Sequence, residues 1–294
     1  NQPDMVTPVG VTEGSRGMTM QWDDDIHHSL HAFFTGETDG YYSDFGTAET
    51  LAKAFTKVFV HDGGWSSFRE QNWGAPVDPN STHYDAASFV SFFEDHDQVG
   101  NRAAGDRPGH NGADPNIQAA AAALYLLGPF TPMIFMGEEW AASTPFPFFS
   151  DLGPDLGPMV TTGRRQEFEK MGWQGVIPDP QSVTTFKSAQ LNWAERREPD
   201  HAHMLAWYQT LLDIRSSLHQ RSSHDLSSTS METPSPDAVV MRRPGVTVIA
   251  SRSEVPVTVS DLPENPSSTL VMGHQKVTET WITLTCPGCV VIVA

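Results

Sequence analysis

The stretch Phe89-Val-Ser-Phe-Phe93, followed by Glu94-Asp-His-Asp-Gln-Val-Gly-Asn-Arg102, decides the fold class of this chain. Its first part is an apolar run broken by one serine, which is typical of a buried strand. Seven of the nine residues that follow are polar or charged. In an α/β barrel the active site lies at the carboxyl ends of the strands. We therefore expect this segment to carry chemistry rather than core packing.

Strand-like and helix-like segments alternate along the first 220 residues. The apolar spacing and the capping residues predict strands over 17–22, 88–93 and 132–136, and helices over 26–34, from Thr47, 114–127 and 201–218. Asp200 is expected to cap the last helix. Its inward residues should be Met204, Leu205, Tyr208, Leu211 and Leu212. We expect irregular structure over 62–87 and 144–180, and a Ser-rich linker over 219–236.

The pattern changes after the Ser-rich segment. Short β runs follow over 238–241, 246–250, 255–259, 269–272, 278–284 and 290–293, which predicts a small all-β sandwich. We therefore expect a partial α/β barrel over 1–220 and a C-terminal β-domain over 237–294. Because a complete barrel needs about 250 residues and eight strands, three strands predict an elaborated or incomplete barrel.

Composition excludes several kinds of partner. The net charge is -18 and the pI is about 4.9, so the chain repels phosphate backbones and anionic lipids. We expect no nucleic-acid partner, no membrane partner and a cytoplasmic location. The uncharged stretch Ile117–Met136 contains Gly128, Pro129 and Pro132, so it predicts a buried helix, a turn and a buried strand rather than a membrane span.

The cysteine and histidine patterns have structural interpretations. Cys286-Pro-Gly-Cys289 joins two apolar runs, which favours a β-hairpin over a redox motif. His27 and His31 have the i, i+4 spacing of metal ligands. No Glu of a general-base pattern accompanies them, which favours a structural role over a metal site. We expect no metal ion and no cofactor.

Asp97 is the best catalytic candidate of the sequence. A carboxylate at a barrel strand end can bind sugar hydroxyls and stabilise a developing positive charge. The alternative is a structural salt bridge with Arg102 or Arg107.

Aromatic residues gather in the predicted loops near this segment. Such rings stack on the apolar faces of sugars, but they also anchor loops, and both interpretations stay open for Tyr41-Tyr42, Trp65, Phe68 and Trp73. Arg69 has the forked donor geometry that suits a hydroxyl or a carboxylate. Of Glu138 and Glu139, one is expected to line the site and the other to anchor Arg164 or Arg165.

The segment His96-Asp-Gln-Val-Gly-Asn-Arg102 resembles the fourth signature segment of the α-amylase superfamily, in the form of its maltooligosyltrehalose trehalohydrolase branch. Further segments support the resemblance in the same order. They are Gln21-Trp-Asp-Asp-Asp-Ile-His-His28, Thr35-Gly-Glu-Thr-Asp-Gly-Tyr-Tyr-Ser-Asp-Phe-Gly46, Phe59-Val-His-Asp-Gly63, Phe135-Met-Gly-Glu-Glu-Trp-Ala-Ala-Ser-Thr-Pro145, Gly163-Arg-Arg-Gln-Glu-Phe168 and Pro178-Asp-Pro-Gln181.

The resemblance implies a (β/α)8 TIM barrel with a C-terminal β-domain, of which this chain supplies about strands six to eight. It implies retaining hydrolysis of the α-1,4 bond next to the terminal trehalose of maltooligosyltrehalose. Asp97 would be the transition-state stabiliser. The substrate-binding residues would be His96, Gln98, Tyr41, Phe68, Arg69 and Glu138.

The chain also departs from the family pattern. The motifs of the nucleophile Asp and the acid Glu do not occur, and Pro147 and Leu152 stand where polar residues are expected. We therefore expect the C-terminal part of a longer enzyme, inactive alone and poorly soluble. The alternatives are a non-catalytic carbohydrate-binding remnant, or a related branching enzyme or amylase.

Overall fold

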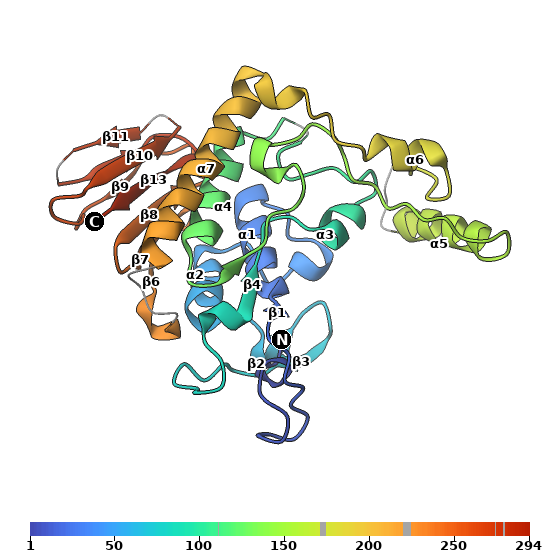
Figure 1. The fold of residues 1–294 in the computed structure, drawn as a ribbon, viewed down its shortest axis with the longest axis horizontal. Helices are drawn as coiled ribbons and strands as arrows, with labels where there is room; N and C mark the ends of the chain where they lie inside the picture. Colours follow the sequence, from blue (N-terminus) through green and yellow to red (C-terminus); the bar gives the residue numbers. More distant parts are fainter. Residues whose placement is uncertain (111, 171–174, 220–224, 274, 279) are drawn as a thin grey trace. The chain divides into compact units, whose positions relative to one another are not determined.

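The computed structural model describes residues 1–110, 112–170, 175–219, 225–273, 275–278 and 280–294. The chain forms two compact units (Figure 1). The first comprises Asn1–Phe93, Asp114–Met133 and Trp207–Ala294, and the second comprises Glu94–Ala113 and Ile134–Ala206.

The first unit contains a short parallel sheet. Its strands are β1 (Gln21–Trp22), β4 (Phe89–Ser91) and β5 (Thr131–Pro132), in the order β1-β4-β5. The three predicted strands are thus present but shorter, and β5 begins one residue before the predicted start and ends at Pro132. Parallel strands joined by helices form a segment of an α/β barrel, as expected.

The helices predicted from Thr47 and Asp114 begin at these caps, whereas the helix predicted from Ile26 begins two residues earlier, after a cap at Asp23 that was not predicted. The side chain of Asp23 accepts hydrogen bonds at the start of α1 (Asp24–Thr35), and Thr47 does the same for α2 (Ala48–Lys57). Asp114 caps α4 (Pro115–Leu127) with proline as the first helical residue. Gly36 ends α1 with φ +76°, a conformation that glycine adopts without strain.

Four predictions about the irregular segments are wrong. Residues 62–87 contain an antiparallel hairpin of β2 (Asp62–Ser66) and β3 (Gln71–Gly74). Residues 144–180 contain α5 (Leu156–Lys170), and the Ser-rich segment contains β6 (Ser230–Ser235). Asp200 lies in the first turn of α7 (Pro199–His219) instead of before it. Residues 171–174 and 220–224 of these segments lie outside the described part of the chain.

The remaining helices are α3 (His96–Gly100) and α6 (Val183–Ser188), both in the second unit. On α7, Met204, Tyr208 and Leu211 are buried and Leu205 is half-buried, as predicted. Leu212 was expected inward but is 39% exposed, because the helix periodicity places it beside the buried stripe.

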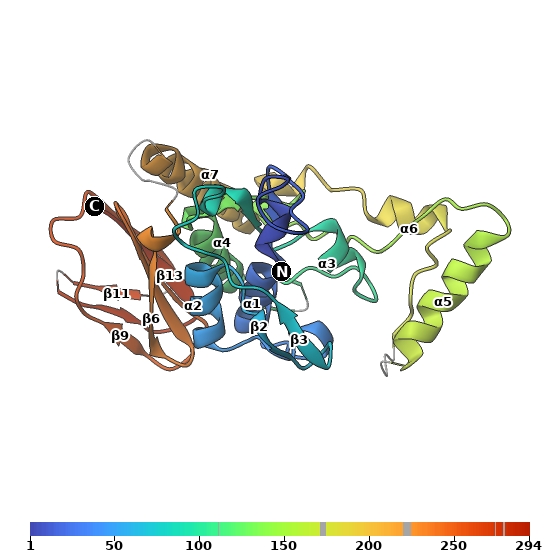
Figure 2. The ribbon, with the colours of Figure 1, turned by 90° about the horizontal axis from the view of Figure 1, so that it is seen from below.

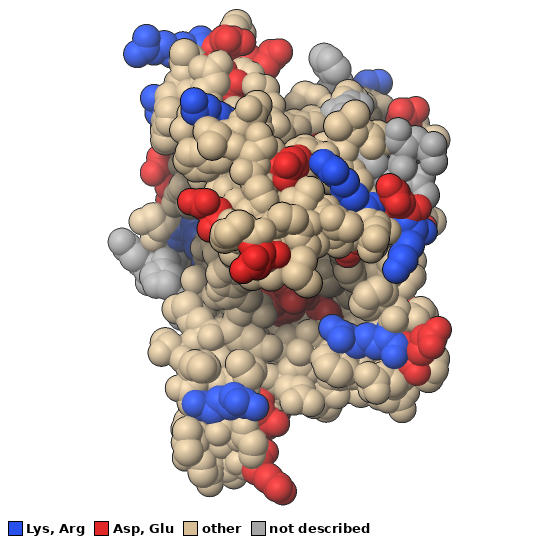
Figure 3. Space-filling view, turned by 90° about the vertical axis from the view of Figure 1, so that its right-hand side faces the viewer, with Lys and Arg blue, Asp and Glu red and all other residues tan. Residues whose placement is uncertain are grey.

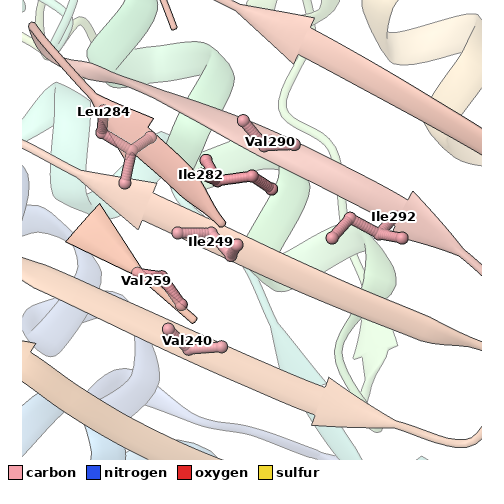
Figure 4. Close-up of a cluster of buried hydrophobic side chains, with 7 residues drawn as sticks. All are labelled: Val240, Ile249, Val259, Ile282, Leu284, Val290 and Ile292. Carbon is pink, nitrogen blue, oxygen red and sulfur yellow. The ribbon is translucent and has the colours of Figure 1, made fainter. Parts of the chain in front are cut away.

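Two sheets face each other in the β-rich part of the first unit. One has the order β10-β13-β8-β7-β6 and the other β11-β12-β9. The strands are β7 (Ala238–Arg243), β8 (Val246–Ser251), β9 (Val257–Val259), β10 (Ser268–Met272), β11 (Gln275–Val277), β12 (Ile282–Leu284) and β13 (Gly288–Val293). Buried side chains from both sheets form one core (Figure 4): Val240, Ile249, Val259, Ile282, Leu284, Val290 and Ile292. This is the expected sandwich. The domain boundaries at 220 and 237 stay a prediction.

The predicted hairpin at Cys286-Pro-Gly-Cys289 is wrong. β12 pairs with β9 and β11, whereas β13 pairs with β8 and β10, so the segment carries the chain from one sheet to the other. Gly288 permits this crossing, because a Cβ atom there would lie 2.3 Å from the carbonyl oxygen of Met272. Both cysteines are free thiols, and burial raises the pKa of Cys289.

Helices cover the outer face of the larger sheet. α4 packs on β8 and β13, and α2 packs on β6 (Figures 1 and 2). All six residues of β8 are buried, because the sandwich core covers one face and α4 the other.

Arginines from distant segments close the carboxyl end of α4. Arg215 Nη1 donates hydrogen bonds to the carbonyl oxygens of Leu126 and Gly128, at 2.7 and 3.0 Å. Arg243 Nη1 donates to those of Leu127 and Gly128, both at 2.7 Å. The last turn of α4 has no basic residue of its own. The two guanidinium groups therefore satisfy carbonyl groups that have no helical partner.

Replacing Arg243 with methionine is expected to lower the free energy of unfolding by about 2 kcal/mol, because the helix end loses a charged donor in a buried setting. Urea unfolding followed by circular dichroism measures this. The matched control is Arg242→Met in the same strand. That residue forms an exposed pair with Glu232, so its loss should be under about 1 kcal/mol. Equal losses in the two variants would contradict the capping role.

Candidate functional site

The polar segment after β4 forms the short helix α3 in the second unit. Asp95 caps it, with Oδ1 2.6 Å from the backbone nitrogen of Gln98. The side chains of His96 and Asp97 are 56% and 65% exposed, and His96 Nε2 lies 3.4 Å from Asp97 Oδ1. The helix start thus presents a carboxylate and an imidazole to solvent, next to the half-buried Gln98.

Glu94 precedes this helix and is buried against Arg107. Arg107 Nη1 lies 2.6 Å from Glu94 Oε2, and its other nitrogens donate to the carbonyl oxygens of Met136 and Thr144 at 2.9 Å each. Burial raises the pKa of Glu94, and the Arg107 guanidinium opposes this rise. Arg102 forms its ion pair with Asp106 at 2.8 Å. Arg107 thus pairs with Glu94 and Arg102 with Asp106, instead of with Asp97.

Glu138 and Glu139 follow β5 in the chain and lie in the second unit. Glu138 is fully buried, and its Oε2 accepts a hydrogen bond from the backbone nitrogen of Phe135 at 3.2 Å. Glu139 accepts one from Gly137 at 3.0 Å. Arg164 donates to the carbonyl oxygens at the end of α3, on Gly100 and Arg102. A binding role for Glu138 stays a prediction, and its burial gives it a structural role in this turn.

Two predicted binding residues of the first unit contact each other. The rings of Tyr41 and Phe68 have centroids 5.1 Å apart in an edge-to-face arrangement, and they are 43% and 50% exposed. Arg69 lies beside Phe68, and its guanidinium carbon stands 4.0 Å from the ring centre of Trp73. An exposed aromatic pair beside a cation suits stacking on a sugar ring.

His27 and His31 have partners within the protein. His27 Nε2 is 3.2 Å from the hydroxyl of Tyr42, and His31 Nε2 is 2.8 Å from Glu37 Oε2. Their rings stack with centroids 5.6 Å apart. Among the described residues no group of three or more His, Cys, Asp and Glu side chains is arranged to hold a metal ion.

Asp25, Asp44 and His61 form a cluster that was not predicted from the sequence, and it is named the carboxylate–histidine cluster. His61 Nε2 lies 2.9 Å from Asp44 Oδ2, and His61 Nδ1 lies 3.8 Å from Asp25 Oδ1. Asp25 Oδ2 also accepts from the backbone nitrogens of Val60 and His61, both at 2.8 Å. The available signal was the position of His61 in Phe59-Val-His-Asp-Gly63, a segment that resembles the family and follows α2 by one residue.

Comparisons with known proteins define the class of this chain. No family model matches it. A solved structure from Salmonella typhimurium, assigned as an α-amylase, is similar over 94% of this chain and 47% of its own, with 31% identity and a TM-score of 0.80. The chain is therefore a member of the α-amylase superfamily, whose glycoside hydrolases combine a barrel with β-domains.

Two relatives specify the family. The malto-oligosyltrehalose trehalohydrolase of Arthrobacter ramosus is 51% identical over 204 residues, which are 69% of this chain and 35% of the relative. That of Rhizobium sp. (strain M-11) is 40% identical over 277 residues, 93% of this chain and 45% of the relative. The chain belongs to the malto-oligosyltrehalose trehalohydrolase family. It spans less than half the length of these relatives.

In the described residues we find no helix with the length and apolar character needed to cross a bilayer. The stretch 117–136 instead contains most of the buried helix α4, a bend and β5, as predicted, except that β5 is half-buried instead of buried.

Proposed function

We propose that this chain contributes part of the sugar-binding and transition-state machinery of a trehalose-releasing glycoside hydrolase. The observation that carries the proposal is the exposed Asp97 carboxylate at the start of α3, the first helix after the parallel strand β4. The names of the relatives support the reaction, which is hydrolysis of the α-1,4 bond next to the terminal trehalose of maltooligosyltrehalose.

Asp97 is assigned to stabilising the oxocarbenium-like transition state, because a fixed carboxylate interacts most strongly when positive charge develops on the sugar. His96 and Gln98 are assigned to neighbouring sugar hydroxyls. Asp95 orients all three by fixing the helix start. Retaining hydrolysis also needs a carboxylate nucleophile and a carboxylic acid. Their family motifs do not occur in this sequence, so the proposal assigns both to the part of the relatives' length that this chain does not span.

In the first unit, Tyr41 and Phe68 are assigned to stacking on a glucose ring and Arg69 to hydroxyl groups. In the second unit, Glu138 is assigned to sugar binding indirectly, through the turn that it holds. The face in Figure 3 shows acidic and basic side chains in small interspersed groups. With the net charge of -18, this supports an uncharged sugar as partner over a nucleic acid. A cytoplasmic location stays a prediction.

We expect the 294-residue chain alone to release no trehalose from maltotriosyltrehalose, because covalent catalysis lacks its nucleophile. The measurement is chromatographic product analysis. The protein expressed from the complete reading frame is the positive control and should yield trehalose. Branched products or maltose from that control would instead identify a branching enzyme or an amylase. Turnover by the chain itself would contradict the assignment of the nucleophile.

The second candidate function is carbohydrate binding without hydrolysis, which the exposed Tyr41–Phe68 pair favours. Calorimetry of the chain with maltooligosyltrehalose tests it. Binding heat supports this candidate, and its complete absence at millimolar sugar rejects it.

A further inference from the structure

The carboxylate–histidine cluster connects the two halves of the aromatic pair. Asp44 lies three residues after Tyr41, and Ser67 directly precedes Phe68. Asp44 Oδ2 accepts two hydrogen bonds, from His61 Nε2 at 2.9 Å and from the backbone nitrogen of Ser67 at 2.8 Å. One carboxylate oxygen therefore ties the loop that carries Tyr41 to the hairpin turn that carries Phe68.

His61 in turn is held from two sides. Its ring nitrogens face Asp44 and Asp25, and its own backbone nitrogen donates to Asp25 Oδ2. The edge of the ring of Phe45 packs against the imidazole, with centroids 5.3 Å apart. Because Asp25 lies on α1, the hairpin and the loop are both fixed to a buried helix.

The charges around His61 favour its protonated form. Asp25 and Asp44 are the acidic groups that face it, and His28 is a basic group that interacts with it electrostatically. The neighbouring Asp62 is paired with Lys53 at 2.9 Å. The Asp25 carboxylate, 3.8 Å from Nδ1, and the hydrogen bond with Asp44 raise the pKa of His61, and burial opposes this rise. Burial alone would raise the pKa of Asp44, but Ser67 and His61 hold it below its usual range.

We propose that Asp44 is a positioning residue for sugar binding, which sets Phe68 against Tyr41 and depends on the protonated His61 ring to stay in place. The proposal rests on the function proposed above, since it assumes that the aromatic pair binds an α-glucan. It adds a specific pH dependence that stacking alone does not have.

The direction of this dependence follows from the geometry. Above the raised pKa of His61, the imidazole loses its positive charge. The proton that leaves is the one on Nδ1, which lies 3.8 Å from Asp25, because Nε2 donates to Asp44 at 2.9 Å. The bond to Asp44 remains but is no longer charge-assisted, so Asp44 is held less firmly. Sugar affinity should therefore be highest below the raised pKa of His61 and fall as the pH rises through it.

Calorimetric titration of the full chain with maltotetraose tests the proposal. Asp44→Ala should raise Kd about tenfold, because the turn loses its tether. Asp44→Asn should stay within about twofold of the wild type near neutral pH, because the amide oxygen still accepts from Ser67. Wild-type Kd should rise as the pH is raised above about 6.5, the ordinary pKa of histidine, and that of Asp44→Asn should stay nearly constant. Asp62→Asn, a carboxylate change in the same hairpin, is the matched control.

Phe68→Ala separates this proposal from the function on which it rests. If Phe68→Ala weakens binding but Asp44→Ala does not, the positioning role is overturned and the binding role stands. If Phe68→Ala leaves Kd unchanged, or the wild type gives no heat, both are overturned. Faster amide hydrogen exchange at Ser67 in Asp44→Ala, with unchanged exchange in α1, is expected. Equal Ser67 exchange in Asp44→Ala and wild type would also overturn the positioning role.

Discussion

Asp97→Asn, introduced into the protein from the complete reading frame, is expected to lower kcat for trehalose release by about 10²–10³-fold. Asparagine keeps the size and the hydrogen-bonding oxygen of aspartate but removes its charge. The lost interaction is therefore the one that strengthens as the sugar becomes positive. KM should change far less than kcat, because ground-state contacts with hydroxyl groups remain. Steady-state kinetics with maltotriosyltrehalose provide the measurement.

The matched control for this variant is Asp155→Asn. Asp155 is an exposed aspartate of the same unit, just before α5, and its replacement should leave both constants unchanged. An Asp97→Asn enzyme with wild-type kcat would show that the exposed carboxylate does not stabilise the transition state. A large rise in KM at constant kcat would assign Asp97 to substrate binding instead.

Arg107→Ala is expected to lower the free energy of unfolding of the second unit by about 3–5 kcal/mol. The change leaves the buried Glu94 carboxylate without its cation, and the carbonyl oxygens of Met136 and Thr144 lose their donors. Urea unfolding followed by the fluorescence of Trp140 and Trp193, both in this unit, gives the value.

A double variant separates the contribution of the buried charges to stability from that of side-chain packing. Glu94→Leu combined with Arg107→Met removes both charges at similar volume, so it should recover part of the lost stability. Full recovery is not expected, because the two carbonyl oxygens still lack donors. Arg242→Ala, which breaks an exposed pair, should cost under about 1 kcal/mol. A similarly small loss for Arg107→Ala would contradict the structural role of the buried pair.

The elements that could be predicted from sequence have strong local signals. Asp23, Thr47 and Asp114 each satisfy backbone nitrogens within three residues, so their helices were predicted with ends close to those observed. Helix α5 was missed because Gly157, Pro158 and Gly163 interrupt its pattern and little of it is buried. The placement of β12 and β13 in different sheets was not predicted, because a hairpin and a crossing between sheets use the same turn residues.

The candidate site was accessible to sequence reasoning only in part. A strand followed by charged residues predicted the position of the exposed Asp97, because the carboxyl ends of barrel strands generally carry the active-site residues. The partners of Arg107 and His61 were not predictable in the same way. Thr144 follows Arg107 by 37 residues, and Asp25 precedes His61 by 36, so local periodicity carries no information about either contact. Burial of Glu138 likewise depends on the tertiary fold.

The closure of α4 by Arg243 has a consequence for folding during synthesis. The guanidinium that caps Leu127 comes 116 residues later in the chain. At ordinary elongation rates the ribosome needs roughly 6 to 23 s to make that length. During this interval the nascent helix has neither this cap nor the strands β8 and β13 that cover it. Its alanine-rich surface is then open to chaperones and to other nascent chains. The helix therefore stays exposed until the strands of the sandwich have been synthesised.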